Sequence, residues 1–511
     1  MTTLIKRWQT ACALAVTACM FTPSMVSAQT RGGKIDVAVI GEMPTFDPMA
    51  STADLVGTVT QHYYETLFTF DSKWQTTPLL AATMPQINAD GTQYTIALRQ
   101  GVTFHNGAAM TSKDVVDSLK RWTRVAPRGK QVAGNIEAIE AVDDFTISIK
   151  LKEPYVPLLS LLAFNNAAAV IMPAGTPDAA PRQPIGTGPY QFQEYRPDQY
   201  LQLTRFEKYQ SRTEEPDNFG GARKQFLDEI RFVPVPDVNT RIEGTLAGQY
   251  DYADIIGPES IDRIKGQAEP FILKPAIFYL YVLNTKQGPF ANVKLRQAMQ
   301  QALNMDDTLA VAIGRKEFYS AKGALYPEGF TWHTEQGVKG HYNTGDIAKA
   351  TRLVKEAGYD GTPIRILSTR QNEINYQVAL MASEYLKAAG FKVDLQVMDW
   401  ATLLSRRANP DLWDIFPTST PYLPDPALIA TLSESYPGWW TSPERAAAFD
   451  AMNREIDPEK RKAHWATLQQ VIFEQAPFIK IGDLNSLASK STRLKGMTPS
   501  PWPYFWNAYK D

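Results

Sequence analysis

Arg370 is the residue whose type and position best suit the binding of a charged small molecule. Ile364 to Leu367 reads as a strand, and Ser368-Thr369-Arg370-Gln371 follows it directly. Ligands of open α/β sheets lie at the carboxyl ends of strands. A guanidinium group there can hold a carboxylate through two parallel hydrogen bonds. Arg370 is therefore a candidate carboxylate-binding residue, and a surface arginine at a strand end is the alternative interpretation.

Aromatic residues in loops form a second group of candidates. The chain contains 11 Trp, 22 Tyr and 23 Phe. Tyr422 lies in Pro421-Tyr422-Leu423-Pro424, and Trp439-Trp440 follow Pro437-Gly438. Loop aromatics are better candidates for a ligand surface than aromatics on a periodic stripe. Packing against neighbouring elements is the alternative for each of them.

Signatures of catalysis and of metal binding are missing. Gly186-Thr187-Gly188-Pro189-Tyr190 is not a phosphate-binding loop, because Pro189 removes a backbone donor and no third glycine follows at the right spacing. The chain has no Gly-x-Ser-x-Gly elbow, and its five histidines form no His-Glu-x-x-His pair. We therefore expect no enzyme, no cofactor and no resident metal ion; a histidine that helps to hold a chelated metal stays open.

The first residues predict export. Lys6 and Arg7 precede an apolar run that ends near Met20, and Val26-Ser27-Ala28 offers a small-residue cleavage site. This is the pattern of a secretory signal peptide over residues 1–28, with cleavage after Ala28. The competing interpretation is a lipoprotein box, Val16-Thr17-Ala18-Cys19, with a lipid on Cys19.

Both cysteines, Cys12 and Cys19, precede Ala28, so the mature chain is expected to contain no disulfide. The net charge of −2 provides no basic field for nucleic acid and no polybasic patch for lipid. An exported protein without a nucleic-acid partner is the expectation.

Strands and helices alternate along the chain. Thr111-Ser112-Lys113-Asp114 predicts a capping box at the start of a helix, and Phe145 to Leu151 alternates as a strand. Asp346 is a candidate N-cap of a helix that ends before Gly358. Residues 364–397 read as strand, helix and strand with short connections, which predicts a βαβ unit within an α/β lobe.

One long block carries a family resemblance. Leu98-Arg99-Gln100-Gly101-Val102-Thr103-Phe104-His105-Asn106-Gly107, which leads into Met110-Thr111-Ser112-Lys113-Asp114-Val115-Val116, resembles the signature of the bacterial family 5 extracellular solute-binding proteins. Further segments resemble that family in the same order: Thr45-Phe46-Asp47-Pro48, Tyr64 to Phe68, Ile185 to Tyr190, Asn284 to Leu303 and Lys349 to Tyr359.

The resemblance implies the α/β fold of the type II periplasmic binding proteins: two α/β lobes joined by a hinge, with an extra domain inserted in the first lobe. Carried over to this sequence, lobe I takes residues 29–68, 185–278 and 485–511. The inserted domain takes residues 69–184 and lobe II residues 279–484. The crossing segments are expected near Phe278–Leu283 and Ile479–Asn485.

The resemblance also implies a function: the periplasmic substrate-binding component of an ABC importer. Such a protein captures a small polar solute by closure of its lobes and delivers it to an inner-membrane permease and ATPase complex. A peptide is the expected solute, and opines, oligosaccharides and chelated nickel are the alternatives. A monomer is expected. An exported hydrolase and a receptor subunit that signals without transport are the other classes considered.

Arg370 resembles the arginine with which dipeptide-binding members grip the carboxylate of the peptide. The aspartate that meets the free amino group in those members has no counterpart here. Its position falls on Tyr422, or on Thr420 if the loop is shifted. Asp425 could take over that role or could serve the geometry of the Asp425-Pro426 turn.

Trp400 resembles a tryptophan that the family often places after the strand at 391–398. With Phe46, Tyr422, Trp439 and Trp440 it is expected to form an aromatic cage or platform around the solute.

Overall fold

A computed structural model describes residues 31–511. The predicted signal peptide, its cleavage site at Ala28 and both cysteines lie outside the described residues. Among residues 31–511, no helix combines the length and the apolar character that a membrane span requires.

Most strands belong to one mixed sheet of 11 strands. In spatial order its main path is β15 (Val393–Val397), β14 (Ile364–Ser368), β16 (Ile415–Pro421), β12 (Glu269–Leu283), β17 (Phe478–Lys490), β11 (Tyr252–Ile256), β1 (Lys34–Val39), β10 (Glu229–Pro234), β9 (Tyr200–Arg205) and β8 (Tyr190–Arg196). β13 (Tyr319–Ser320) pairs with β17 beside this path.

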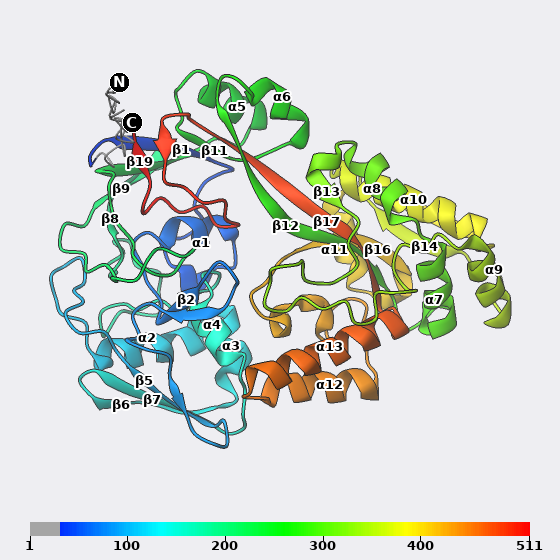
Figure 1. The fold of residues 1–511 in the computed structure, drawn as a ribbon, viewed down its shortest axis with the longest axis horizontal. Helices are drawn as coiled ribbons and strands as arrows, with labels where there is room; N and C mark the ends of the chain where they lie inside the picture. The colour runs from blue at the N-terminus through cyan, green and yellow to red at the C-terminus, as the bar shows by residue number, and fades with distance from the viewer. Residues whose placement is uncertain (1–30) are drawn as a thin grey trace, which may run out of the picture.

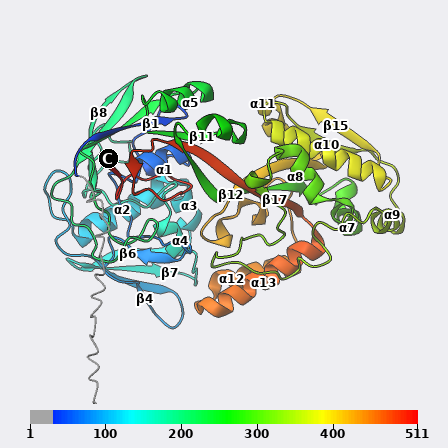
Figure 2. The same ribbon diagram turned by 45° about the horizontal axis from the view of Figure 1, so that its top comes forward.

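Two long antiparallel strands, β12 and β17, join the two halves of this sheet. At one end β17 pairs with β11, through Tyr252↔Lys490 and Ala253↔Ser489. At the other end β12 pairs with β16, from Ile277↔Pro421 to Leu283↔Ile415. Figures 1 and 2 both show the two strands passing from one half of the molecule to the other. Both segments that were expected to cross lie within these strands.

Lobe I is the half built on β1 and β8–β11, and lobe II is the half built on β14–β16. In lobe I, β1 runs parallel to β10 and to β11. The helices of lobe I are α1 (Asp54–Thr60), α5 (Val238–Leu246) and α6 (Ile261–Ile264). Lobe I also contains two short antiparallel strand pairs: β2 (Phe68–Phe70) with β3 (Thr76–Pro78), and β18 (Leu494–Lys495) with β19 (Tyr509–Lys510). The last residues of the chain return to lobe I, beside β1 (Figure 1).

A separate antiparallel sheet, which we call the insert, lies against lobe I. Its strand order is β4 (Gln86–Ile87), β5 (Gln93–Ala97), β7 (Thr146–Leu151) and β6 (Ile136–Asp143). Its helices are α2 (Ser112–Val125), α3 (Pro127–Ala133) and α4 (Leu158–Ala163). The predicted capping box of Thr111 and Asp114 is confirmed at the start of α2.

Lobe II confirms the predicted βαβ unit, because β14 and β15 are parallel and α10 (Glu373–Ala388) connects them. Asp346 caps the next predicted helix by accepting a hydrogen bond from the backbone of Lys349. The helices of lobe II are α7 (Val293–Ala302), α8 (Met305–Ile313), α9 (Ile347–Glu356), α10, α11 (Trp400–Arg407), α12 (Pro443–Arg454) and α13 (Pro458–Gln475).

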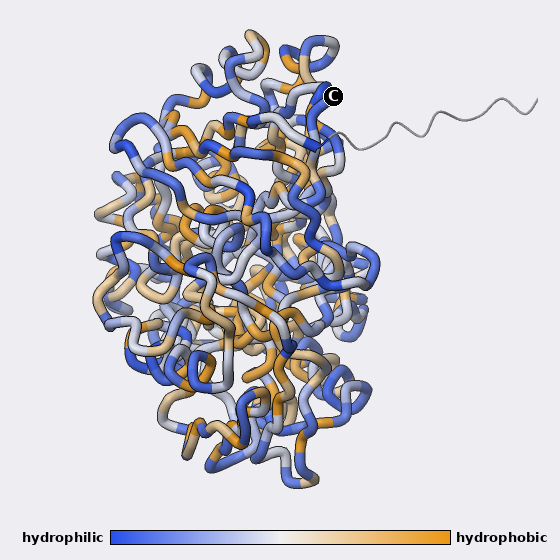
Figure 3. Tube along the Cα trace, turned by 90° about the vertical axis from the view of Figure 1, so that its left-hand side faces the viewer, coloured by the Kyte–Doolittle hydropathy of each residue, from blue (hydrophilic) through white to orange (hydrophobic). Residues whose placement is uncertain are grey.

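In the molecule as a whole, apolar segments run through the interior and hydrophilic ones predominate on the outer turns (Figure 3).

Candidate functional site

Two adjoining cavities lie between lobe I and lobe II, against the crossing strand β12. They share four lining residues, Leu273, Ala276, Pro499 and Pro501. The first, which we call the α1 cavity, has a volume of about 300 Å³. The second, which we call the Tyr422 cavity, has a volume of about 380 Å³. Together they offer the space that a ligand of a few residues needs.

The α1 cavity takes its walls from both lobes and from the crossing strands. Lobe I contributes Ile40, Asp54, Leu55, Asp254 and Ile255, and Pro421 at the end of β16 comes from lobe II. A group bound there would therefore touch elements that lie far apart in the sequence and would favour a closed arrangement of the lobes.

Two carboxylates, Asp54 and Asp254, lie in this cavity. One Asp54 oxygen accepts hydrogen bonds from Trp502 Nε1 (3.0 Å) and from Asn166 Nδ2 (3.1 Å). Burial raises the pKa of Asp254 to about 6, and the charge of Asp54 adds to the rise. Burial and the charge of Asp54 therefore destabilise ionised Asp254, and a bound cation would stabilise it.

An apolar wall faces the same space. Ile40 and Ile255 are 45% and 56% exposed, which is unusual for large aliphatic side chains. Ile255 also has a φ of 44°, in a region that a β-branched residue rarely adopts. Strained residues of this kind cluster at binding sites. The cavity thus combines acidic groups with apolar surface.

Arg370 lies just beyond β14, at the predicted end of the strand, and its side chain is exposed. Its guanidinium group stacks on Tyr376, 3.9 Å from the ring centroid, and donates a hydrogen bond of 2.7 Å to the Tyr376 hydroxyl. Within residues 31–511 it forms no ion pair with a carboxylate. Arg370 lines neither cavity, and its role as a carboxylate-binding residue stays a prediction.

Trp400 lies next to the Arg370 loop. It begins α11 and is 40% exposed. Its backbone N–H donates a hydrogen bond of 2.6 Å to the side chain of Gln371. The structure thus brings Trp400 and Arg370 to the same edge of lobe II, as expected for residues that follow the parallel strands β15 and β14.

Thr420 and Tyr422 lie at the end of β16. Thr420 is half-buried opposite Phe278 of β12. Tyr422 is buried, lines the Tyr422 cavity and donates a hydrogen bond to Asp483. Asp483 also pairs with the buried ammonium of Lys480. Neither Tyr422 nor Thr420, the two positions at which the resemblance would place the aspartate of dipeptide-binding members, is acidic, and the Tyr422 hydroxyl is already engaged.

Asp425 serves the turn and a buried ion pair. Its carboxylate accepts hydrogen bonds from Arg461 (2.8 and 3.0 Å), from Ser160 Oγ (3.1 Å) and from the backbone of Ala427 (2.9 Å). The side chain is completely buried. The turn interpretation is confirmed, and Asp425 offers no free oxygen to an ammonium group.

The remaining predicted aromatics pack against other elements. Phe46 contacts Phe192 and Tyr195, and Trp439 packs on Trp413 with ring centroids 5.7 Å apart. Trp440 is buried and donates to the side chain of Gln475 at 2.8 Å.

Phe46, Trp439 and Trp440 line neither cavity, so the structure does not gather the five predicted aromatics into one cage. The reason is that each of these three rings has neighbouring apolar or polar side chains to pack against. Sequence reasoning missed Asp54, Asp254, Ile40 and Ile255, which carry no motif.

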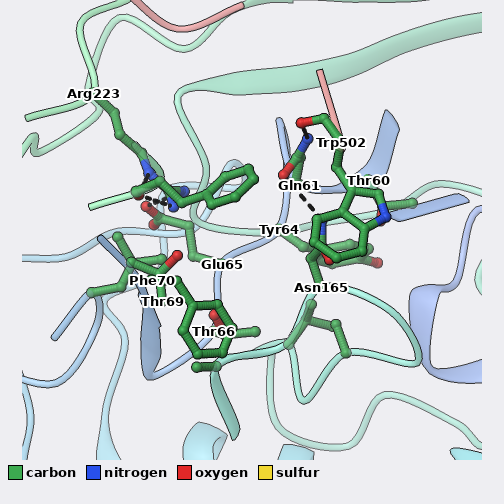
Figure 4. Close-up of a pocket in the computed structure, with 15 residues that line it drawn as sticks. Thr60, Gln61, Tyr64, Glu65, Thr66, Thr69, Phe70, Asn165, Arg223 and Trp502 are labelled. Atoms are coloured by element: carbon green, nitrogen blue, oxygen red, sulfur yellow. Dashed lines mark hydrogen bonds and ion pairs between the residues drawn. The ribbon is translucent and has the colours of Figure 1, made fainter. Parts of the chain in front are cut away.

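A third cavity lies inside lobe I and the insert, and it is too small for a solute. Its volume of about 30 Å³ holds little more than one water molecule. Figure 4 shows Glu65 and Arg223, which are 3.6 Å apart, and Gln61 beside Trp502 on its walls. The two interlobe cavities are large enough for a solute and take walls from both lobes, which makes them the candidate solute site.

A family model agrees with this geometry. The bacterial extracellular solute-binding proteins, family 5, match residues 75–438. The chain belongs to this family. Its structure is the type II periplasmic-binding-protein fold that the sequence predicted. The crystal structure of the ABC transporter substrate-binding protein CtaP from Listeria monocytogenes superposes with a TM-score of 0.80 at 22% identity, and covers 94% of this chain and 100% of that one.

Curated relatives cover most of the chain. A probable peptide ABC transporter periplasmic-binding protein, y4tO of Sinorhizobium fredii, is 27% identical over 522 residues, which cover 97% of this chain and 98% of the relative. The glutathione-binding protein GsiB of Pectobacterium atrosepticum is 31% identical over 406 residues, which cover 78% of this chain and 74% of the relative.

Proposed function

We propose that this protein is the periplasmic substrate-binding component of an ABC importer, that it captures a peptide or a similar small polar solute between its lobes, and that it delivers the solute unchanged. The observation that carries the proposal is the pair of cavities between two lobes that are joined by β12 and β17. The partners are an inner-membrane permease and ATPase complex, and the binding protein acts as a monomer without cofactor.

Closure of the lobes is the proposed mechanism. A hinge at two strands permits rigid-body motion of one lobe against the other. Closure removes water from the cleft, so each polar contact with the solute gains strength and each missing contact becomes costly. The permease can then distinguish the closed, loaded form from the open one, provided that the solute binds the closed form better.

A peptide suits the lobe II side of the cleft because β16 has a free edge. β14 pairs with β16 only at Ile366↔Ile415. Among residues 31–511, no strand pairs with residues 418–421 on the side away from β12. An extended peptide can add its backbone to such an edge. Arg370, beyond the neighbouring strand β14, would hold the carboxylate of the peptide.

The division into parts follows the sequence expectation: residues 29–68, 185–278 and 485–511 as lobe I, 69–184 as the inserted domain and 279–484 as lobe II. Residues 1–28 would direct export and be removed after Ala28, with lipidation of Cys19 as the alternative. Mass spectrometry of the secreted chain distinguishes the two by the mass of its N-terminal peptide.

The function is tested by thermal unfolding of the purified chain from residue 29. The solutes are di- and tripeptides, opines, oligosaccharides and nickel chelates. A cognate solute at 100 times its dissociation constant stabilises the fold by about 2.7 kcal/mol. Stabilisation by peptides, with the peptide recovered intact, is the expected result. A shift with a sugar and with no peptide would refute the peptide assignment, and conversion of the solute would refute the binding role.

A further inference from the structure

In peptide-type recognition the positive end of the solute requires an anion, and lobe II does not provide one at the expected positions. Tyr422 is neutral at physiological pH, and Asp425 is occupied by Arg461. Asp483 is paired with Lys480. A buried ammonium without an anion costs several kcal/mol. Lobe I, on the other side of the cleft, can provide the counter-charge.

The α1 cavity of lobe I has that charge. Asp54 and Asp254 line it together, from α1 and β11. Within the described residues 31–511, neither carboxylate takes part in a salt bridge. Arg241 and Arg128, whose charges act on Asp254 and Asp54, direct their donors elsewhere: Arg241 donates to the carbonyls of Val235, Pro236, Asp254 and Ile255, and Arg128 donates to Asn166.

Three fully buried carboxylates among residues 31–511 differ in this respect from the partly buried Asp254. Asp47 pairs with Arg121, Asp414 with Arg365 and Asp425 with Arg461. Asp254 instead faces a cavity of about 300 Å³ with a second carboxylate and the exposed side chains of Ile40 and Ile255 on its walls. A solute that carries a cationic group next to apolar atoms would complement these walls.

We propose that the solute inserts a cationic group, an ammonium or a guanidinium, between Asp54 and Asp254 of lobe I. This inference rests on the proposed function and names the charge that the solute must carry. The solute class is then a peptide or amino-acid conjugate with a free amine or a basic side chain, whose positive end meets lobe I and whose negative end meets lobe II. Attraction of the two ends to different lobes would favour closure.

The test compares the tripeptide Ala-Phe-Ala with its N-acetyl form by isothermal titration at pH 7.5, on the chain from residue 29. N-acetylation should weaken binding about tenfold or more. Asp254→Asn should weaken the free-amine peptide by a similar factor and remove its advantage over the acetylated form. Asp54→Asn keeps the oxygen that accepts from Trp502 and Asn166, and should cost about three- to fivefold because Asp54 is exposed.

Asp90→Asn is the matched control, because it removes one negative charge from the exposed turn between β4 and β5, remote from the cavity lining. It should bind as the parent does, and thermal unfolding checks that all variants are folded. Equal binding of the two peptide forms, or unchanged affinity in Asp254→Asn, overturns the inference while the proposed function stands.

If neither peptide binds, the solute that copurifies with the chain is identified by mass spectrometry, and its charge tests the inference. A solute without a cationic group overturns the inference. A cationic solute that is not a peptide supports the inference and refutes the peptide assignment.

Discussion

Replacement of Asp425 by alanine is expected to destabilise the protein without acting through the solute. Four donors converge on its carboxylate, two of them from Arg461, and both side chains are buried, with 0% and 7% exposure. Removing one partner of a buried ion pair leaves an uncompensated charge and costs about 3–5 kcal/mol. Loss of the cap at Ala427 adds to this cost.

Urea unfolding followed by tryptophan fluorescence measures the effect. With a slope of about 3 kcal/mol per M or more for a protein of this size, the midpoint should fall by about 1 M. The double variant Asp425→Leu with Arg461→Met removes both charges, and should recover most of the loss because apolar pairs often replace buried ion pairs at little cost.

Measuring solute affinity in Asp425 variants distinguishes a structural role of this carboxylate from a solute-binding role. If Asp425 were the anion that meets an ammonium group, Asp425→Asn would lose affinity at nearly unchanged stability. A drop in unfolding free energy below about 1 kcal/mol for Asp425→Ala, together with a large loss of affinity, would refute the structural role of this carboxylate.

Three further outcomes are expected. Arg370→Ala should weaken a carboxylate-bearing peptide at least about tenfold in titration, and an unchanged affinity removes Arg370 from the site. Because the pKa of Asp254 is about 6, affinity for a cationic peptide should fall about tenfold from pH 7.5 to pH 5 as Asp254 takes up a proton, and should stay flat in Asp254→Asn. Burial lowers the pKa of His62 to about 3, with Nε2 accepting from the backbone of Phe505 at 3.0 Å. The unfolded chain therefore takes up a proton first, near pH 6.5, and this contribution to the unfolding free energy is lost as the pH falls from 6.5 toward 3. Its size is on the order of 5 kcal/mol, and a pH profile of urea unfolding that does not differ between the parent and His62→Gln would contradict it.

Local signals predicted much of the fold because they depend on residues close in sequence. The capping box of Thr111 and Asp114 and the cap at Asp346 are interactions across three positions. The parallel pair β14 and β15 with its connecting helix follows from alternating and helical patterns over residues 364–397. The crossing strands could be predicted only from the family resemblance. The sequence of a 15-residue strand such as β12 does not show which strands it pairs with.

The site was harder to predict because its walls meet only in three dimensions. Arg370 and Trp400 could be paired in advance, since both follow parallel strands of one unit. Asp54 and Asp254 could not, because their approach depends on the pairing of β1 with β11 and on the return of the C-terminal segment. Asp425 had a local signal for its turn but none for Arg461, which lies 36 positions later.

The C-terminal segment also sets when the protein can begin to work. Trp502, Phe505 and Trp506 are buried in lobe I, and Trp502 both lines the α1 cavity and donates to Asp54. A chain synthesised from its N-terminus keeps this half of the molecule unfinished until Trp502 to Trp506 have emerged. Products of premature termination that lack the residues from Trp502 onward would therefore lack one wall of the α1 cavity and could not bind a solute there as the full chain does.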